Sequence, residues 1–252
     1  MVVGDFHVGS RYGLNLPEYV SPKMERESDC LMLYEDWEEV IDWANKVHYA
    51  FFMGDMCDGW NPKEHGNDRT QEENAQVESA SKLAKMIRGN PECHVVEGSG
   101  YHRGSKNLDD LFAKEINAVP HPKYGYFAWP DKTLEIEKVP FHLAHNITVS
   151  KSTWQYRTTP AARELILAIL NENPARIVLR AHAHYYVYAG FTKTLGMVIP
   201  GFQTQTPFMT RISPFNEPRW GGVLFEVDGE NFVWDENIWK PDMKAEMFRG
   251  GR

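Results

Sequence analysis

Short strings containing aspartate or histidine follow the apolar runs of this chain, and they restrict its fold more than any other feature. They are GDFH at residues 4–7, GDMCDG at 54–59, GSGYHR at 98–103, FHLAH at 141–145 and AHAH at 181–184. In Asp-x-His and His-x-His the two side chains are two residues apart, so on an extended chain they point the same way. Asp and His suit Mn, Fe, Zn, Ni or Mg as ligands. The strings therefore predict a two-metal hydrolytic site built at the ends of strands.

Composition places the chain among globular proteins and away from membranes. Of its 252 residues, 42% are hydrophobic and 25% are charged, which is typical of a soluble domain. No apolar run approaches the roughly 20 residues that span a bilayer. Cys30, Cys57 and Cys93 are odd in number and far apart, so they predict neither a zinc finger nor a disulfide framework. We expect a cytoplasmic protein.

The net charge of −8 argues against broad capture of duplex nucleic acid, which requires a clustered basic surface. It does not exclude a nuclease, because bound divalent ions offset acidic ligands locally.

Apolar periodicity predicts strands that alternate with helices, and polar strings follow the first three strands. Sites in open α/β sheets lie beyond the carboxyl ends of strands. A strand of three residues is unusually short, so we expect a misplaced start or residues lost upstream of Met1. Pro140 is expected to separate two strands, and Asp228-Gly229 predicts a hairpin turn. The expected helices cover 34–46, 71–88, 108–116 and 161–170; the expected strands cover 1–3, 49–53, 93–97, 133–139, 141–144, 177–179, 185–190, 195–199, 222–227 and 232–234.

The order of these strings resembles the calcineurin-like metallophosphoesterase superfamily. Its pattern is Asp-x-His, Gly-Asp-x-x-Asp, Gly-Asn-His-Asp/Glu, a lone His and Gly-His-x-His, and the match runs from residue 4 to residue 184. The resemblance implies an α/β fold with two packed mixed β-sheets flanked by α-helices, a four-layer sandwich. We expect residues 1–252 to form a single domain of this kind. The string DFHVGS at residues 5–10 is also similar to the Mre11/SbcD nuclease branch.

The resemblance implies two divalent metal ions, with Mn as first choice and Fe, Ni, Zn or Mg also suitable. The ligands it implies are Asp5, His7 and His184 for the first ion, His145 and His182 for the second, and Asp55 as a bridge. Alternation along the strand does not decide between His142 and His145. We choose His145 because it ends the strand, where a loop can aim it. Asp58 is expected to orient a ligand from outside the metal shell or to cap the turn.

His102 matches a family histidine that is not a ligand and that protonates the leaving oxygen or stabilises the transition state. The chain departs from the family on either side of it. Tyr101 stands where the family has an asparagine ligand of the second metal, so water, Ser99 or a tyrosinate would complete that site. Arg103 replaces an acidic residue and can clamp a substrate phosphate. Tyr101 and Arg157 are further candidates for substrate binding.

Together these features predict a divalent-metal-dependent phosphoester hydrolase. The first choice is a phosphodiesterase acting on a nucleotide or nucleic-acid phosphodiester through a metal-bridging hydroxide. No Gly-x-Ser-x-Gly or P-loop string suggests a covalent intermediate. One alternative is a phosphomonoesterase, including a protein phosphatase, and another is a non-catalytic binding or scaffold protein on the same fold. The expected partner is a phosphoester substrate and not a membrane, and the sequence leaves the oligomeric state open.

Overall fold

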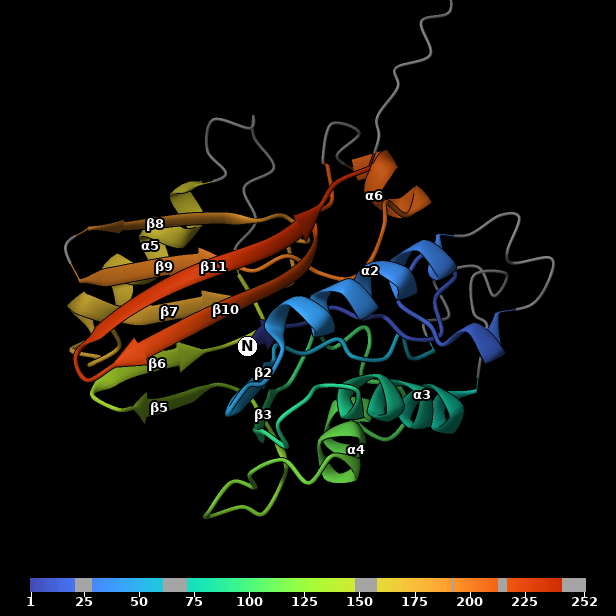
Figure 1. The fold of residues 1–252 in the computed structure, drawn as a ribbon, viewed down its shortest axis with the longest axis horizontal. Coiled ribbons are helices and arrows are strands. Elements are labelled where there is room, and N and C mark those ends of the chain that lie inside the picture. The colour runs from blue at the N-terminus through green and yellow to red at the C-terminus, as the bar shows by residue number, and fades with distance from the viewer. Residues whose placement is uncertain (21–28, 61–71, 148–157, 192, 213–216, 242–252) are drawn as a thin grey trace, which may run out of the picture.

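The fold is described from a computed structural model, which places residues 1–20, 29–60, 72–147, 158–191, 193–212 and 217–241 (Figure 1). The helices in these ranges are α2 (Cys30–Ala44), α3 (Glu73–Lys85), α4 (Leu108–Glu115), α5 (Thr158–Leu170) and α6 (Pro207–Ile212), with a 3-10 turn η1 (Pro17–Tyr19). None of these helices is long and apolar enough to cross a membrane.

The first sheet contains the amino-terminal strands. Its six strands in spatial order are β11 (Asn231–Trp239), β10 (Trp220–Asp228), β1 (Val2–Val3), β2 (Tyr49–Phe52), β3 (Glu92–Val96) and β4 (Ala128–Trp129). Strands β1 to β4 are parallel, whereas β10 runs antiparallel to β1 and to β11. Val2 pairs with Phe51 on one side and Val223 on the other. The very short β1 is therefore a central strand, and its carboxyl end lies beside that of β2.

The second sheet is built from the carboxyl-terminal half of the chain. Its five strands in spatial order are β5 (Lys132–Ile136), β6 (Val139–Leu143), β7 (Ile177–Arg180), β9 (Thr194–Val198) and β8 (Val187–Phe191). The three inner strands are parallel, and the two outer strands are antiparallel to their neighbours. The histidines that follow β6 and β7 therefore emerge at the same end of this sheet.

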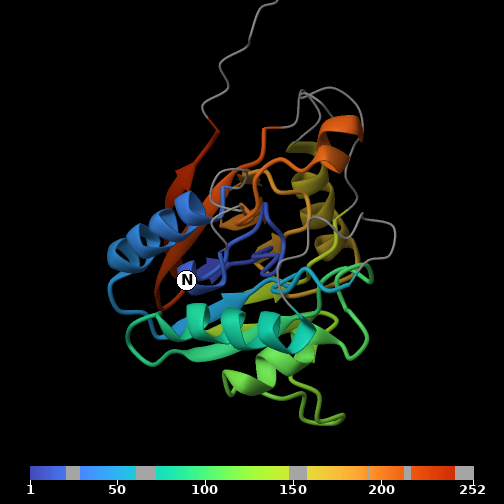
Figure 2. The same ribbon diagram turned by 90° about the vertical axis from the view of Figure 1, so that its right-hand side faces the viewer.

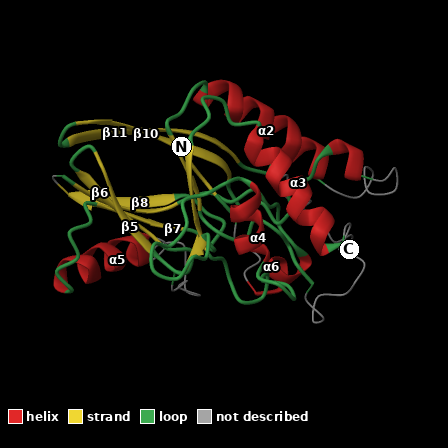
Figure 3. Cartoon of the chain, turned by 90° about the horizontal axis from the view of Figure 1, so that it is seen from below, coloured by secondary structure: helices red, strands yellow, loops and turns green. Residues whose placement is uncertain are grey.

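The two sheets pack face to face and carry helices on their outer sides (Figures 2 and 3). Phe51 and Met53 belong to the core between the sheets, whereas Ala50 and Phe52 belong to the core beneath α2, α3 and α4. This alternation follows from the two-residue period of a strand, and it explains why β2 is apolar at nearly every position. Helix α5 covers the outer face of the second sheet. The predicted class, two packed mixed sheets flanked by helices, is confirmed.

Phe6 anchors the segment between the first two predicted ligands. It is fully buried, and its ring lies 5.1 Å from Trp37 of α2 and 5.5 Å from Phe202. Full burial of such a side chain contributes about 1.5–3 kcal/mol. Because Phe6 enters the core beneath the helices, Asp5 and His7 on either side of it are held in fixed positions.

The predicted elements are present, but many of their ends differ from the predicted ones by a few residues. Pro140 lies inside β6, opposite Glu135, and the turn before it is made at Glu137, whose φ is 57°. Proline is tolerated near the start of a strand, where a missing N–H costs little. The last hairpin turns at Gly229 and Glu230, because Asp228 still pairs with Asn231. Strand β4 and helix α6 were not predicted; both are too short to show a period.

A buried histidine on β3 and a buried lysine on β5 link the two sheets. His94 on β3 accepts a hydrogen bond at Nδ1 from Lys132 Nζ at 2.7 Å, and the lysine lies 3.9 Å from the ring centre of Trp129. Burial, followed by the charge of Lys132, lowers the pKa of His94 to about 4. Burial likewise lowers the pKa of Lys132, to about 8.

This shift predicts an acid-sensitive contribution to stability. Above pH 6.5 His94 is neutral in both the folded and the unfolded chain. Below pH 6.5 the unfolded chain binds a proton at this residue, whereas the folded chain binds one only below about pH 4. Folding should therefore lose about 3 kcal/mol from this residue as the pH falls through that window. Urea titrations of chelator-treated wild type and His94→Gln should show their difference in unfolding free energy changing across this window. A constant difference from pH 7 to pH 4 would contradict the assignment.

Candidate metal centre

The site forms where five strand ends meet between the two sheets. Its side chains are Asp5 and His7 after β1, Asp55 and Asp58 after β2, Ser99 and His102 after β3, His145 after β6, and His182 and His184 after β7. Asp5 N donates to Gly54 O at 2.9 Å, and His7 N donates to Asp55 O at 3.0 Å, which joins the first two loops. His182 N donates to Asp5 Oδ2 at 3.2 Å and joins the second sheet to the first.

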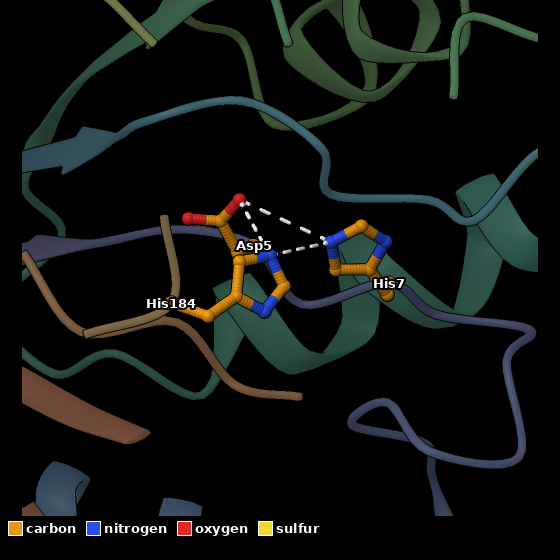
Figure 4. Close-up of side chains that lie close together, drawn as sticks. All are labelled: Asp5, His7 and His184. Carbon is orange, nitrogen blue, oxygen red and sulfur yellow. Dashed lines mark hydrogen bonds and ion pairs between the residues drawn. The ribbon is translucent and has the colours of Figure 1, made fainter. Parts of the chain in front are cut away.

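Asp5, His7 and His184 aim one donor atom each at a common point (Figure 4). The two Nε2 atoms are 3.3 Å apart, and they lie 3.9 and 3.4 Å from Asp5 Oδ1. A point equidistant from three atoms so spaced lies about 2.1 Å from each, which is a metal–ligand distance for N and O donors. Asp5 Oδ1 is buried and has no hydrogen-bond partner among the described residues. These three residues therefore fit a divalent ion.

Asp55, His145 and His182 form a second donor group beside the first. His145 Nε2 lies 3.0 Å from Asp55 Oδ2 and 3.2 Å from His182 Nδ1. Its other nitrogen, Nδ1, donates to Met53 O at 2.7 Å. Such a bond to a backbone carbonyl fixes the ring orientation and directs the opposite nitrogen into the site. His145, the histidine chosen from the sequence, lies in this donor group. His142 lies outside it and contacts Arg180 and Asp131.

The charges of this group are strongly coupled. Burial by itself would lower the pKa of His145, but the carboxylates of Asp55 and Asp5 and the carbonyl of Met53 outweigh it and raise that pKa to about 10. Burial would raise the pKa of Asp55, but the neighbouring imidazoles of His145, His102 and His7 hold it well below its usual value. The buried carboxylates are therefore stabilised by positive charge nearby, which a divalent ion would supply if it were bound.

Left-handed backbone is concentrated at the donors. The residues with positive φ here are Asp5 (51°), His7 (46°), Asp55 (50°), His182 (70°) and His184 (52°). The expectation that Asp-x-His and His-x-His present their side chains from extended chain is therefore wrong. Each residue in this region costs about 1–3 kcal/mol unless surrounding contacts stabilise it. The backbone bonds between the loops and the strand ends provide those contacts, so the fold holds the donors in conformations that isolated strands would avoid.

His102 stands at the edge of the centre. Its Nδ1 donates to Asp58 O at 2.7 Å, and Asp58 Oδ1 lies 3.4 Å from the same nitrogen. Asp58 Oδ1 also lies 3.3 Å from His7 Nδ1. Asp58 therefore contacts both a predicted ligand and the predicted acid from outside the metal shell. The rings of His7 and His102 meet edge to face, 4.4 Å apart.

The structure places the residues flanking His102 away from the donors. Tyr101 is 63% exposed, and Ser99 takes the place beside Asp55: its N and Oγ lie 2.7 and 3.3 Å from Asp55 Oδ1. Ser99 is therefore the residue beside Asp55, and one residue, Gly100, separates it from Tyr101. Arg103 forms an ion pair with Glu97 outside the cluster. Arg157 lies outside the described residues.

Two buried residues that support the loops were not predicted. Asp109, in the first turn of α4, accepts hydrogen bonds from Met56 N at 3.1 Å and Gly98 N at 2.7 Å. Asn15 Oδ1 accepts one from Gly9 N at 2.9 Å. The only sequence signal for Asp109 is an acidic residue on the apolar face of a helix. Gly98 itself must lack a side chain, because a Cβ there would overlap the Asp55 carboxylate.

The topology and the donor order together decide the fold assignment. Asp-x-His, Asp, His and His-x-His follow strands of two facing mixed sheets and converge in the order of the resemblance. The chain therefore has the architecture of two packed mixed sheets flanked by helices, with the donor groups at the strand ends between the sheets. Ser99 lies beside the second donor group and hydrogen-bonds its Asp55 carboxylate.

Comparison with known proteins gives remote structural similarity. No protein-family model matches the chain, and no curated protein is significantly similar to it. Among solved structures, the Zn-complexed Vps29 of Entamoeba histolytica is similar at 10% identity with a TM-score of 0.48, covering 95% of this chain and 97% of its own. A novel archaeal phosphodiesterase has 12% identity, a TM-score of 0.46 and coverages of 94% and 98%. A phosphoesterase from E. coli has 12% identity, a TM-score of 0.43 and coverages of 88% and 85%. Because these values are low, the description of the fold depends on the topology and donor order of the chain itself.

Proposed function

We propose that the chain is a divalent-metal-dependent phosphoester hydrolase, and that its substrate is a phosphodiester of a nucleotide or nucleic acid. The observation that carries this proposal is the pair of adjacent donor groups, one of Asp5, His7 and His184 and the other of Asp55, His145 and His182. Divalent ions held there, with Mn as first choice, would supply Lewis acidity toward a phosphate and activate water near neutral pH. Asp55 would lie between the two ions.

His102 is the residue proposed to handle the leaving group. Because Nδ1 donates to the Asp58 carbonyl, Nε2 is the nitrogen that would exchange a proton with a departing alcohol. Asp58 would position this imidazole and that of His7 at once. Arg103 is proposed as an additional phosphate contact, and it would have to leave Glu97 to make it.

The test measures turnover of bis-p-nitrophenyl phosphate and p-nitrophenyl phosphate by protein reconstituted with Mn. Faster turnover of the diester supports the phosphodiesterase, and faster turnover of the monoester supports the alternative phosphomonoesterase. One further candidate is a binding protein on this fold with a weakened second site, because the residue beside Asp55 is a serine, Ser99, and Tyr101 is exposed. Bound metal without turnover of either ester would support that candidate and overturn the hydrolase.

The first donor group, Asp5, His7 and His184, predicts a minimum metal content for the purified protein. Its three donors are complete and buried, so wild type reconstituted with Mn should retain about one equivalent or more after desalting. His184→Ala removes one donor and should lower that content. His142→Ala, a histidine outside the cluster, is the matched control and should leave it unchanged. Elemental analysis below about a tenth of an equivalent in the wild type would contradict the metal site.

A further inference from the structure

A second hollow lies at the opposite end of the sandwich from the metal centre. Its volume is about 390 Å³, within the size range of ligand pockets. Arg176 in its wall precedes β7, whereas the metal-centre histidines follow β7. Tyr188 of β8 and Trp234 of β11 meet edge to face with ring centres 5.3 Å apart, so both sheets contribute to the wall. The lining residues are Arg176, Tyr188, Gly190, Phe191, Lys193, Thr194, Leu195, Asn231, Phe232 and Trp234.

Arg176 joins the parts of this wall and brings a positive charge to it. Its Nε donates to Lys193 O at 3.0 Å and its Nη1 to Glu230 O at 2.6 Å, and its guanidinium lies 5.5 Å from the ring centre of Phe232. Both acceptors are neutral carbonyls. The lining includes a second cation, Lys193, and no acidic residue, although the whole chain has a net charge of −8. The lining of this hollow is therefore suited to an anionic group beside aromatic rings.

Strand β8 borders the hollow and is an edge strand. It pairs with β9 along one side, and no other described strand pairs with its outer side. Its sequence, Val-Tyr-Ala-Gly-Phe at residues 187–191, contains neither a charge nor a proline, the usual devices that prevent another chain from pairing with an edge. Tyr188 and Phe191 remain 48% and 58% exposed. An apolar, unprotected edge beside an aromatic pocket is suited to receive an extended chain.

We infer that β8 and the adjoining pocket bind an extended acidic peptide segment of a partner protein. The segment adds a strand to the outer edge of β8, so backbone hydrogen bonds provide affinity. An apolar side chain of the segment enters between Tyr188, Phe191 and Trp234. A carboxylate of the segment lies against Arg176 and Lys193. This site is separate from the metal centre and does not depend on hydrolytic activity.

Fluorescence anisotropy with a defined probe tests the inference. The probe is a fluorescein-labelled peptide, Asp-Phe-Asp-Leu-Asp-Phe, whose apolar side chains share one face of a strand. One control peptide replaces every Asp with Lys, and a second is the acidic peptide with alternate backbone nitrogens methylated. The acidic probe should bind full-length wild type saturably, and both controls should bind at least about tenfold more weakly. Raising the salt concentration should weaken binding of the acidic probe.

Protein variants separate the pocket from other surfaces. Phe191→Ala removes an exposed wall of the pocket without opening the core and should weaken probe binding about tenfold. Lys193→Glu should weaken it about threefold or more. Val233→Ala is the matched control, because Val233 is 61% exposed and absent from the pocket lining; its affinity should stay within about twofold of wild type.

Several results would overturn the inference. These are no saturable binding, equal binding of the lysine or methylated peptides, or equal affinity of Phe191→Ala and wild type. Sedimentation velocity provides a further check. If wild type were a dimer and Phe191→Ala a monomer, a second copy of the chain would occupy this face instead of a peptide.

Discussion

Asp55→Asn should abolish turnover with Mn while leaving the chain folded. Ser99 contacts Asp55 Oδ1, and His145 lies 3.0 Å from Oδ2; an asparagine of the same shape retains the contact with Ser99 and loses the negative charge. Two cations cannot share a neutral amide as they share a carboxylate, so metal affinity should fall for both ions. We expect a loss of more than about 100-fold in kcat/KM, since even residues outside the metal shell contribute 10–100-fold. Steady-state kinetics and elemental analysis measure the two effects.

The control for this variant removes a carboxylate elsewhere. Asp42→Asn changes a side chain that is 69% exposed and paired with Arg88, so it should retain metal and activity. Circular dichroism of both variants should match the wild type. Near-native turnover by Asp55→Asn would show that Asp55 does not lie between the ions, and the whole assignment of the second string would be wrong.

The strands and the order of the donors could be predicted because each depends on local pattern. Apolar runs such as residues 49–53 are buried on both faces of a parallel sheet, which leaves a continuous hydrophobic signal. The same signal could not choose between His142 and His145. Strand β6 ends at Leu143, so side-chain alternation no longer applies at His145, and the position of that ring depends on the Met53 carbonyl in another sheet.

The conformation of the donor loops could not be predicted, because it depends on contacts between distant segments. Asp5 and His184 adopt positive φ, which a sequence normally marks with glycine. Neither position is a glycine, and hydrogen bonds such as that from Asp5 N to Gly54 O stabilise the strained backbone instead. The contact of Ser99 with Asp55 could not be predicted for a related reason, because the path of the loop after β3 determines which residue lies beside that carboxylate.

This distribution of strain has a functional consequence. The donors lie in left-handed backbone that is held by hydrogen bonds between loops from both sheets. Such pre-organisation reduces the conformational entropy that metal binding would otherwise cost. It also means that the residues of the centre destabilise the fold, which the two apolar cores offset.

His102→Ala should separate leaving-group chemistry from metal binding. The imidazole contacts Asp58 and the ring of His7 but belongs to neither primary donor group, so the variant should keep its metal content and its fold. Loss of a positioned proton donor costs about 10²–10⁴-fold in rate. That loss should appear with alkyl or nucleoside leaving groups, which depart slowly without a proton, and should be much smaller with p-nitrophenol. Rate measurements on a series of diesters with leaving groups of different pKa test this expectation.

Two further variants serve as controls for the rate measurements on diesters with different leaving groups. Asp58→Asn leaves the backbone carbonyl that holds His102 Nδ1 in place, so its rate loss should be smaller and should depend on leaving group in the same direction. His121→Ala alters a histidine whose ring lies at a tilt against Tyr124, Tyr126 and Trp129 away from the centre, and it should have no effect. Equal losses for all leaving groups in His102→Ala would show that His102 stabilises the phosphate instead of donating a proton. Loss of bound metal in His102→Ala would make it a ligand, because His7, Asp58 and His102 also place donor atoms within 4.8 Å of one another.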